Sequence, residues 1–389
     1  MENKERALAH IEKIEWIRPI EGADNIELIG VLGWVCIAKK GEFNVGDMAV
    51  YIEIDSKCSE TDERFAFLAN KKFKVKTMKL GKFKVISQGL ALPLTLFPEL
   101  QDKNIGDDVT EVLKITYASE EDAARKTNKV DPNAKYKSMA KRRPKLFANP
   151  IIRRIMRYSI GRKIMFLLFG RKKDNPKKFP DWIVKTDETR IENAPFYLQS
   201  TEKWIKTEKC DGTSCTFAVD RLKKGKNKFD FIVCSRNVRQ ADREQACYHE
   251  SNIYWELADK YDIEKILTQF ATEKNYNRVV LQGEGVGSVQ GNPYKLTENK
   301  LFVFNLIIDG TRLGTVEMAD FCKSHGLTSV PIIDTAYELP KTMEEMKLEA
   351  DGYSELNPKV KREGFVYRSI DGQKSFKNVS REYLLKHNG

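Results

Sequence analysis

Alternating hydrophobic and polar residues predict a series of short β-strands in the first 118 residues of the chain. The alternation is clearest in four segments that lie close together, residues 7–14, 26–32, 34–38 and 48–54. Turns rich in Gly, Asp and Asn separate these segments. Strands that are this short and this closely spaced predict a small barrel.

A different pattern begins at residue 179 and runs to the C-terminus. Strand-like runs alternate there with segments of helical periodicity. The strand-like runs cover residues 229–234, 278–282 and 301–308, and the helical segments cover 251–270 and 315–325. This mixture predicts an α+β domain that is built on antiparallel sheets with flanking helices.

The size of the chain allows two or three folded domains. It has 389 residues, of which 41% are hydrophobic and 10% are aromatic, as in globular proteins. We expect a barrel over residues 1–118, a connector over 119–178 and the α+β domain over 179–389. The first part resembles an OB fold. It has Gly46-Asp47 before a hydrophobic strand and, later in the chain, a hydrophobic segment over residues 89–93.

Positive charge is concentrated in the connector. The formal net charge is +11, but residues 125–178 alone carry 19 Lys or Arg against Asp131 and Asp174, a local excess of 17. The rest of the chain is therefore slightly acidic. Such a block attracts a polyanion through strongly salt-dependent contacts, or it is a solvated linker, and the sequence leaves both interpretations open.

Part of the connector alternates apolar and basic residues at helical spacing, from Pro150 to Phe169. That pattern suits a membrane surface. Because no lipidation signal accompanies it, we expect an amphipathic helix that packs on its own domain, and no membrane partner.

Two basic segments of the N-terminal part, residues 71–76 and 79–84, place Phe73 and Phe83 among lysines. Aromatic and cationic side chains together form a surface on which single-stranded nucleic acid stacks. Edge strands whose lysines face water, and so block aggregation, have the same composition. Both interpretations remain open at this point.

The cysteines and the N-terminus indicate the compartment. Seven cysteines occur without a Cys-x-x-Cys pair, and the four histidines do not cluster near them, so neither a zinc site nor a disulfide framework is predicted. The first 16 residues include acidic side chains and no signal-peptide core, and no run of about 18 apolar residues occurs. We expect a soluble protein of a reducing intracellular compartment, the cytoplasm or the nucleus.

The most informative motif is Glu208-Lys209-Cys210-Asp211-Gly212-Thr213. A Lys-x-Asp-Gly string alone is most often a charged turn. Five further blocks follow it in order, at residues 235–237, 281–285, 301–305, 362–368 and 374–377. This ordered series resembles the nucleotidyltransferase motifs of the covalent ligase and capping-enzyme superfamily.

The resemblance implies a lysine nucleophile and a metal site. Lys209 would attack the α-phosphate of ATP and form a lysyl-adenylate with release of pyrophosphate. Asp211, Glu284 and Glu363 would hold Mg²⁺ or Mn²⁺, either directly or through the water shell of the ion. Without the resemblance, Lys209 is a surface lysine and the three acids are unrelated.

The resemblance also implies the residues that bind the nucleotide. Phe304 would stack on the purine, although its default interpretation is a core aromatic, and Arg236 would contact the ribose or the phosphates. Lys377 would neutralise the α-phosphate, and Lys374 would assist it. Glu208 and Glu284 complete this set.

Within the superfamily, the chain is most similar to ATP-dependent, nick-sealing RNA ligases with an N-terminal OB module. The similarity lies in three blocks, residues 179–193, 208–216 and 363–368. Only 12 residues follow Lys377, which leaves no room for the C-terminal OB domain of DNA ligases and capping guanylyltransferases. One departure is Val379, where the family usually has a second lysine.

The predicted function is to join 3′-OH and 5′-phosphate ends of RNA through a lysyl-adenylate and an adenylylated 5′-end. The expected partners are ATP and RNA, as a nicked duplex, and the sequence does not indicate an oligomeric state. The alternatives are a capping-type guanylyltransferase, a DNA ligase, and a non-catalytic RNA-binding protein with a decayed nucleotidyltransferase domain. A nucleotide preference for GTP separates the capping-type enzyme from an RNA ligase, and a lack of covalent labelling separates the non-catalytic protein from one.

Overall fold

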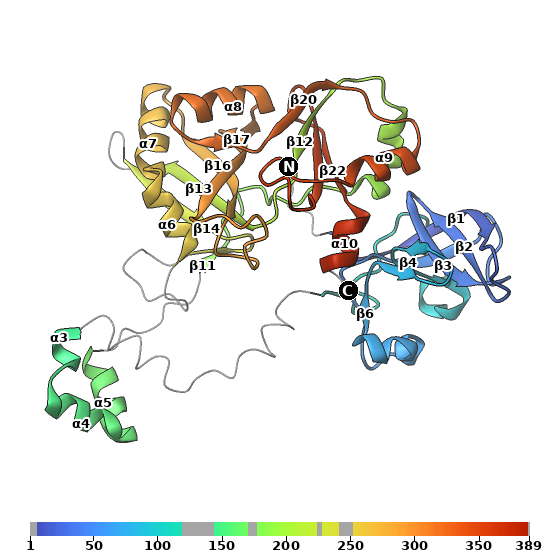
Figure 1. The fold of residues 1–389 in the computed structure, drawn as a ribbon, viewed down its shortest axis with the longest axis horizontal. Coiled ribbons are helices and arrows are strands. Elements are labelled where there is room, and N and C mark those ends of the chain that lie inside the picture. Colours follow the sequence, from blue (N-terminus) through green and yellow to red (C-terminus); the bar gives the residue numbers. More distant parts are fainter. Residues whose placement is uncertain (1–5, 119–143, 170–176, 224–227, 241–251, 388–389) are drawn as a thin grey trace.

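A computed structural model describes residues 6–118, 144–169, 177–223, 228–240 and 252–387 of the chain (Figure 1). An N-terminal β-rich unit and a larger C-terminal unit of sheets and helices lie against each other. A small group of helices, α3 to α5, stands apart from both units.

The N-terminal unit is built on a five-stranded antiparallel sheet in the order β3-β2-β1-β4-β9. Its strands are β1 (Ala9–Pro19), β2 (Ile26–Val31), β3 (Trp34–Lys39), β4 (Met48–Ile52) and β9 (Leu90–Pro93). The four strands predicted from the alternating pattern are thus confirmed. The first is longer than predicted, because β1 pairs with both β2 and β4 and shifts register between Ile14 and Trp16.

Shorter elements surround this sheet. They are β5 (Ser56–Lys57), β6 (Lys74–Val75), β7 (Met78–Leu80), β8 (Val85–Ser87), β10 (Thr116–Tyr117) and the 3-10 helices η1 (Glu63–Lys71), η2 (Leu94–Leu96) and η3 (Pro98–Leu100). The first basic segment of the sequence spans the end of η1 and β6, and the second spans the end of β7 and the turn that precedes β8. Lys72, Lys79 and Lys82 are exposed in these segments, so the surface fits both interpretations of the pattern.

Both faces of the five-stranded sheet are covered. Val50 belongs to a buried cluster with Ile11 and Phe65, whereas its neighbour Tyr51 belongs to a second cluster with Trp34. Successive side chains of a strand point to opposite faces, so β4 contributes to both cores. The second cluster also contains Val379 and Leu384 of the C-terminal unit and therefore continues across the contact between the two units.

Helices α3 (Pro144–Phe147), α4 (Pro150–Arg157) and α5 (Ser159–Phe169) form the small helical group. Asn149 is the N-cap of α4, because its side chain accepts a 2.9 Å hydrogen bond from the Ile151 amide. Pro150 occupies the first helical position. The buried centre consists of Phe147 and Met165. The expectation that an amphipathic helix packs on its own domain does not match this structure, in which the helices pack on one another (Figure 1).

The C-terminal unit contains two antiparallel sheets. The larger follows the order β11-β15-β14-β13-β16-β17-β18, with β19 parallel to β17. Its strands are β11 (Lys177–Lys178), β13 (Thr213–Arg221), β14 (Phe229–Cys234), β15 (Val238–Arg239), β16 (Arg278–Val286), β17 (Lys300–Ile308), β18 (Thr311–Arg312) and β19 (Thr328–Ser329). All three predicted strand-like runs lie in this sheet.

Helices α6 (Ile253–Lys260), α7 (Ile263–Glu273) and α8 (Thr315–Ser324) contribute to the main core of the larger sheet. Leu257, Leu267 and Met318 of these helices are buried against Phe217 and Leu281 of the central strands. The segment predicted as one helix over 251–270 is two helices, which meet near Asp262, a residue with a left-handed backbone (φ 48°).

The smaller sheet has the order β20-β12-β21-β22. Its elements are β12 (Trp204–Glu208), β20 (Ile332–Tyr337), β21 (Gly364–Ser369) and β22 (Ser375–Val379), with η4 (Ile191–Asn193), η5 (Pro195–Gln199), α9 (Met343–Ala350) and α10 (Arg381–His387) around it. Its core is aromatic, with Trp204, Tyr367 and Phe376 buried and the rings of Tyr367 and Phe376 stacked 5.0 Å apart.

The N-terminal unit contacts the C-terminal unit beside η4 and β22. The amide of Gly33 donates a 2.8 Å hydrogen bond to the Glu192 carbonyl, and the Arg190 guanidinium donates a 2.9 Å bond to Asp55. A Cβ atom at Gly33 would lie 2.8 Å from the Glu192 Cα, so only glycine allows this close approach. Across all the described segments, none of the helices has both the length and the apolar character that a membrane span requires.

Candidate active site

Lys209 lies where β12 ends, at the boundary between the two sheets of the C-terminal unit. Its amide donates a 3.0 Å hydrogen bond to the Gly364 carbonyl, which continues the pairing of β12 with β21. Its side chain is 27% exposed, and Nζ lies 2.7 Å from Oε1 of Glu363. Because Glu363 directly precedes β21, strand pairing brings together two motifs that are far apart in the sequence.

The larger sheet supplies the other acids of this cluster. Asp211 lies in the link from β12 to β13, and Glu284 lies on β16 opposite Ser214 of β13. A Cβ atom at Gly212 would lie 2.4 Å from the Gly285 carbonyl oxygen, so the link passes close to β16 only because residue 212 is glycine. The cluster of Lys209, Asp211, Glu284 and Glu363 is hereafter called the lysine-carboxylate cluster.

The charges of this cluster are strongly coupled. Burial disfavours the charged form of Lys209, yet the carboxylates of Glu363 and Glu284 raise the pKa of the amine above its usual value. Burial raises the pKa of Glu284 to about 8, against the opposing effect of Lys209. Burial likewise raises the pKa of Glu363. The cluster thus has more carboxylates than the single lysine can neutralise, which makes it a site for further positive charge.

The donor set fits a hard divalent cation. Asp211, Glu284 and Glu363 offer carboxylate oxygens, the ligands that Mg²⁺ and Mn²⁺ prefer. Among the residues that the structure describes, no three acidic, His or Cys side chains converge closely enough to hold an ion directly. Binding of an ion by these three carboxylates through its water shell stays a prediction.

Lys377 lies on β22 and is almost enclosed. Its side chain is 13% exposed, and Nζ lies 4.0 Å from Oδ1 of Asp187. Burial and then the positive charge of Arg190 lower the pKa of Lys377 to about 7, and Lys209 contributes to the same shift. The structure thus places Lys377 within electrostatic reach of the lysine-carboxylate cluster.

Lys374 is directed elsewhere. It is half exposed, and Nζ lies 2.7 Å from Glu202. Val379, which stands where a second lysine was expected, is buried in the cluster that the N-terminal and C-terminal units share, and its carbonyl accepts a 2.8 Å hydrogen bond from Lys347. The structure therefore does not bring Lys374 to the position of the missing lysine.

The remaining predicted nucleotide contacts differ in their availability. Both carboxylate oxygens of buried Glu208 are engaged, one by the Ser354 hydroxyl and the other by the Glu355 amide at 2.7 Å. Burial nevertheless raises the pKa of Glu208. Phe304 is half-buried at the edge of a cluster that contains Cys210, so its ring lies near the nucleophile block with part of its surface accessible.

Arg236 forms an ion pair with Asp187, in which Nη2 lies 2.7 Å from both carboxylate oxygens. Its guanidinium also lies 5.6 Å from the ring centroid of Tyr117, a residue of the N-terminal unit. Asp187 thus links Arg236 to Lys377, and the N-terminal unit reaches this edge of the site.

Three residues around the site were not predicted as functional. Asp187 lies within a motif block, residues 179–193, that carried the family resemblance without a role for this residue. The Tyr294 hydroxyl accepts a 2.8 Å hydrogen bond from the Asp211 amide. Tyr383 of α10 hydrogen-bonds the Asp211 carboxylate, and burial raises the pKa of its phenol. Nothing local in the sequence marks these two tyrosines.

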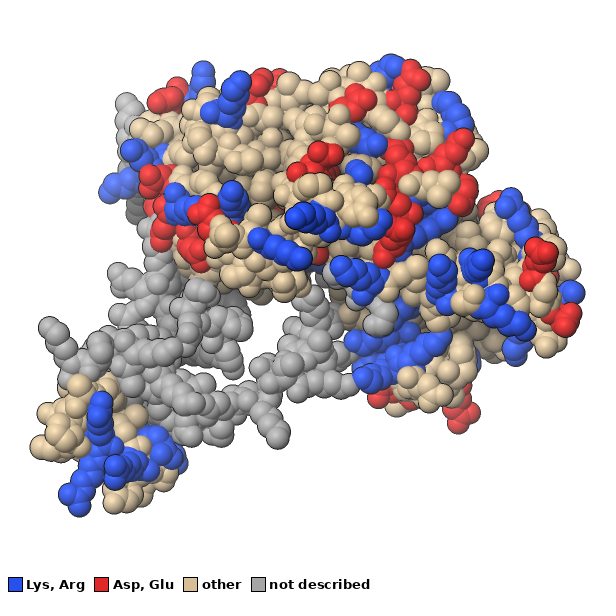
Figure 2. All heavy atoms as spheres, in the orientation of Figure 1, with Lys and Arg blue, Asp and Glu red and all other residues tan. Residues whose placement is uncertain are grey.

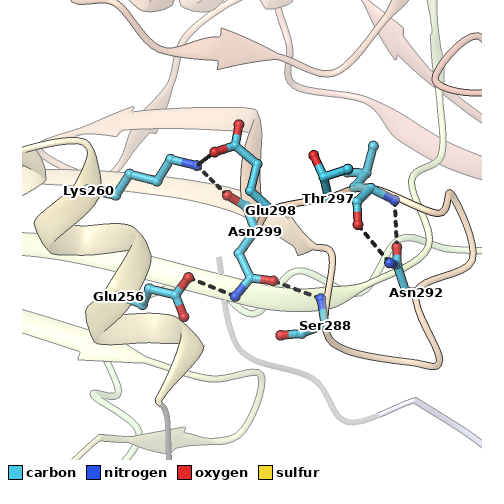
Figure 3. Close-up of a pocket in the computed structure, with 8 residues that line it drawn as sticks. Glu256, Lys260, Ser288, Asn292, Thr297, Glu298 and Asn299 are labelled. Carbon is cyan, nitrogen blue, oxygen red and sulfur yellow. Dashed lines mark hydrogen bonds and ion pairs between the residues drawn. The ribbon is translucent and has the colours of Figure 1, made fainter.

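The loop between β16 and β17, which includes Tyr294, is connected to α6 by a polar network. Figure 3 shows this network. The Asn299 side chain donates to Glu256 of α6 at 2.8 Å and accepts from the Ser288 amide at 2.7 Å. Lys260 donates to the Asn299 carbonyl at 2.7 Å and pairs with Glu298 at 3.1 Å. These groups line a hollow in the surface, and we interpret the contacts between them as bracing for the loop.

Comparisons with known proteins agree with this architecture. An OB-fold domain model matches residues 8–94, and an RNA ligase model matches residues 202–384. Solved structures of an RNA ligase from Naegleria gruberi resemble nearly the whole chain. A comparison with curated proteins finds no match.

The Naegleria structure with PPi has 32% sequence identity and a TM-score of 0.75, with coverage of 98% of this chain and 99% of that chain. An apo mutant structure has 31% identity and a TM-score of 0.75, with coverage of 100% and 99%. A mutant with ATP and Mn has 31% identity and a TM-score of 0.74, with coverage of 98% and 99%. These matches confirm the predicted OB fold and the antiparallel sheets with flanking helices that follow it.

Proposed function

This chain belongs to the RNA ligase family, and from that premise we propose that it joins 3′-OH and 5′-phosphate ends of RNA at nicks. ATP is the co-substrate, in keeping with the Naegleria ligase structures that contain ATP and Mn. The observation that supports the proposal is the lysine-carboxylate cluster, in which a partly accessible amine lies 2.7 Å from a carboxylate.

In the first step, Nζ of Lys209 attacks the α-phosphorus of ATP. The new P–N bond forms as the P–O bond to pyrophosphate breaks, and the amine loses a proton. Glu363 lies at hydrogen-bond distance from Nζ, which supports a role for its carboxylate as the acceptor of that proton. Asp211, Glu284 and Glu363 would hold a divalent metal ion through its water shell, and the ion would supply charge neutralisation for the phosphates.

Lys377 stabilises the charge that develops on the α-phosphate. A preorganised cation in an enclosed site acts more strongly on such charge than it would in water. The nearby Asp187 holds Lys377 and Arg236 on the same side of the site. Phe304 offers a partly accessible ring on which the purine stacks.

In the later steps, the 5′-phosphate of RNA attacks the lysyl-adenylate and takes the AMP. The 3′-OH of the neighbouring strand then attacks the adenylylated 5′-phosphate, with release of AMP and formation of the phosphodiester. In this proposal residues 1–118 hold the RNA, residues 179–389 carry the chemistry, and residues 119–178 connect the two.

Covalent labelling tests the first step. Wild type, Lys209→Ala and the exposed control Lys203→Ala are incubated with labelled ATP and Mg²⁺ or Mn²⁺, beside labelled GTP. We expect label from ATP on the wild type and the control, and none on Lys209→Ala. Label from GTP alone would support a capping-type enzyme, and no label on the wild type would refute covalent catalysis.

The substrate is tested with the same three proteins. We expect sealing of a nicked RNA duplex to exceed the joining of free single-stranded ends, with loss of both in Lys209→Ala. Efficient joining of single-stranded ends without activity at nicks would contradict the nick-sealing proposal while leaving the lysyl-adenylate intact.

A further inference from the structure

Helix α4 carries an exposed apolar stripe. Ile151 and Ile155 are four residues apart and so share one face of the helix. Ile151 is 69% exposed, and Ile155 is also exposed. Their neighbours Ile152 and Met156 pack instead on the small buried centre of the helical group. The exposed isoleucines are therefore extra to what the group needs for its own packing.

Helix α5 repeats this arrangement. Ile160, Ile164, Leu167 and Leu168 follow helical spacing along one side, and all four are exposed. Leu167 is 84% exposed, and Ile160 is 71% exposed. Met165 is the residue of this helix that is buried in the centre of the group. Isolated apolar residues are common on protein surfaces, but a row of large ones on each of two adjacent helices marks an interaction site.

The charges of this group are all positive. Residues 144–169 contain six Lys or Arg and no Asp or Glu. Arg154 lies three residues from both Ile151 and Arg157, and Lys163 directly precedes Ile164, so cations flank both apolar stripes. Figure 2 shows blue and tan atoms without red ones on the face of these helices that it presents.

We propose that helices α4 and α5 bind the surface of an anionic lipid membrane, with their apolar stripes in the interface and their cations at the headgroups. A short helix with a strongly polar basic side and an apolar side lies in the plane of a membrane in this way. The Lys and Arg stems extend along the apolar surface while their charged ends reach the phosphates. The ligase would thereby be held at a lipid surface, which was not expected from the sequence.

A membrane explains these residues better than RNA does. RNA would engage the cations, but its phosphates offer nothing to Ile160, Leu167 or Leu168. The rest of the described chain does not cover them either, since the group stands apart in Figure 1. An anionic lipid surface matches both the charge and the apolar stripes.

Flotation of the full-length protein with vesicles tests the proposal. Vesicles of phosphatidylcholine alone are compared with vesicles that also contain phosphatidylserine. We expect binding only when phosphatidylserine is present. Leu167→Gln with Leu168→Gln should weaken that binding at least about tenfold, because the stripe loses its apolar area. Arg154→Gln with Arg157→Gln should weaken it similarly.

The matched control is Leu348→Gln, which alters an exposed leucine of α9 outside the helical group. It should bind vesicles as the wild type does, and circular dichroism should show all variants folded. Absence of binding to phosphatidylserine vesicles would overturn the proposal. Unchanged binding of the double leucine variant would also overturn it, as would a loss of RNA affinity in that variant with no change at vesicles.

Discussion

Lys209 and Glu363 form a 2.7 Å ion pair at the point where β12 and β21 leave their shared sheet. Their contact depends on the pairing of two strands that are neighbours in the sheet but lie more than 150 residues apart in the sequence. The Glu363 carboxylate contacts the Lys209 amine directly. We therefore expect removal of this carboxylate to affect lysyl-adenylate formation more than folding.

Glu363→Gln should slow lysyl-adenylate formation about 100-fold, because the amide keeps the shape of the side chain but cannot take the proton of Lys209. The rate is measured with labelled ATP in a single turnover. Glu355→Gln is the control, since the Glu355 side chain is exposed and only its backbone amide contacts Glu208. Equal rates for the two variants would show that Glu363 has no part in the step.

Lys377 and Lys374 lie three residues apart and differ in burial, so substitutions at these two lysines can be compared directly. Lys377→Ala should reduce adenylate formation about 100-fold, because an enclosed cation next to the site is lost. Lys374→Ala removes an exposed pair with Glu202, and exposed pairs contribute little, so its rate should stay close to that of the wild type. A larger effect at Lys374 than at Lys377 would mean that Lys374 takes the place of the lysine missing at Val379.

The residues of the lysine-carboxylate cluster could be predicted because each lies in a short motif whose order along the chain is informative. The residues that hydrogen-bond to this cluster could not be predicted in the same way. Tyr294 and Tyr383 reach Asp211 from a loop and from the last helix, and nothing local to either residue indicates that contact. Packing between segments that are far apart in the sequence decides the positions of these two tyrosines, and no periodicity of the sequence reports it.

Hydrophobic patterns predicted the strands of the N-terminal sheet well, because alternation follows directly from the geometry of a strand. The hydrophobic pattern of residues 150–169 was not sufficient to predict how these helices pack. Periodicity shows that a helix has an apolar face, but it does not show what covers that face. In the structure Ile152 and Met156 are covered, while Ile151 and Ile155 are not.

Lys347 and Glu192 form a fully buried ion pair with a 2.5 Å contact beside β22. Lys347→Met should destabilise the protein by about 3–5 kcal/mol, because it leaves the Glu192 carboxylate buried without a partner. Urea unfolding measures the loss. Lys341→Met, at an exposed lysine, should change stability little.

A double variant tests the reason for that loss. Lys347→Met combined with Glu192→Gln should recover part of the stability, since no unpaired charge remains. If the double variant is as unstable as the sum of the two single variants, packing and not charge accounts for the effect.

His10 should make the stability of the protein depend on pH. Despite burial, the hydrogen bonds that His10 donates to Glu12 and Glu53 raise its pKa to about 9 from an ordinary value of 6.5. A raised folded-state pKa stabilises the protein fully below pH 6.5, and this contribution disappears as the pH rises through 9. The contribution is about 3 kcal/mol at most. Urea unfolding of wild type and His10→Gln should therefore differ most near pH 6 and converge above pH 9, and a constant difference would show that His10 is not charged in the folded protein.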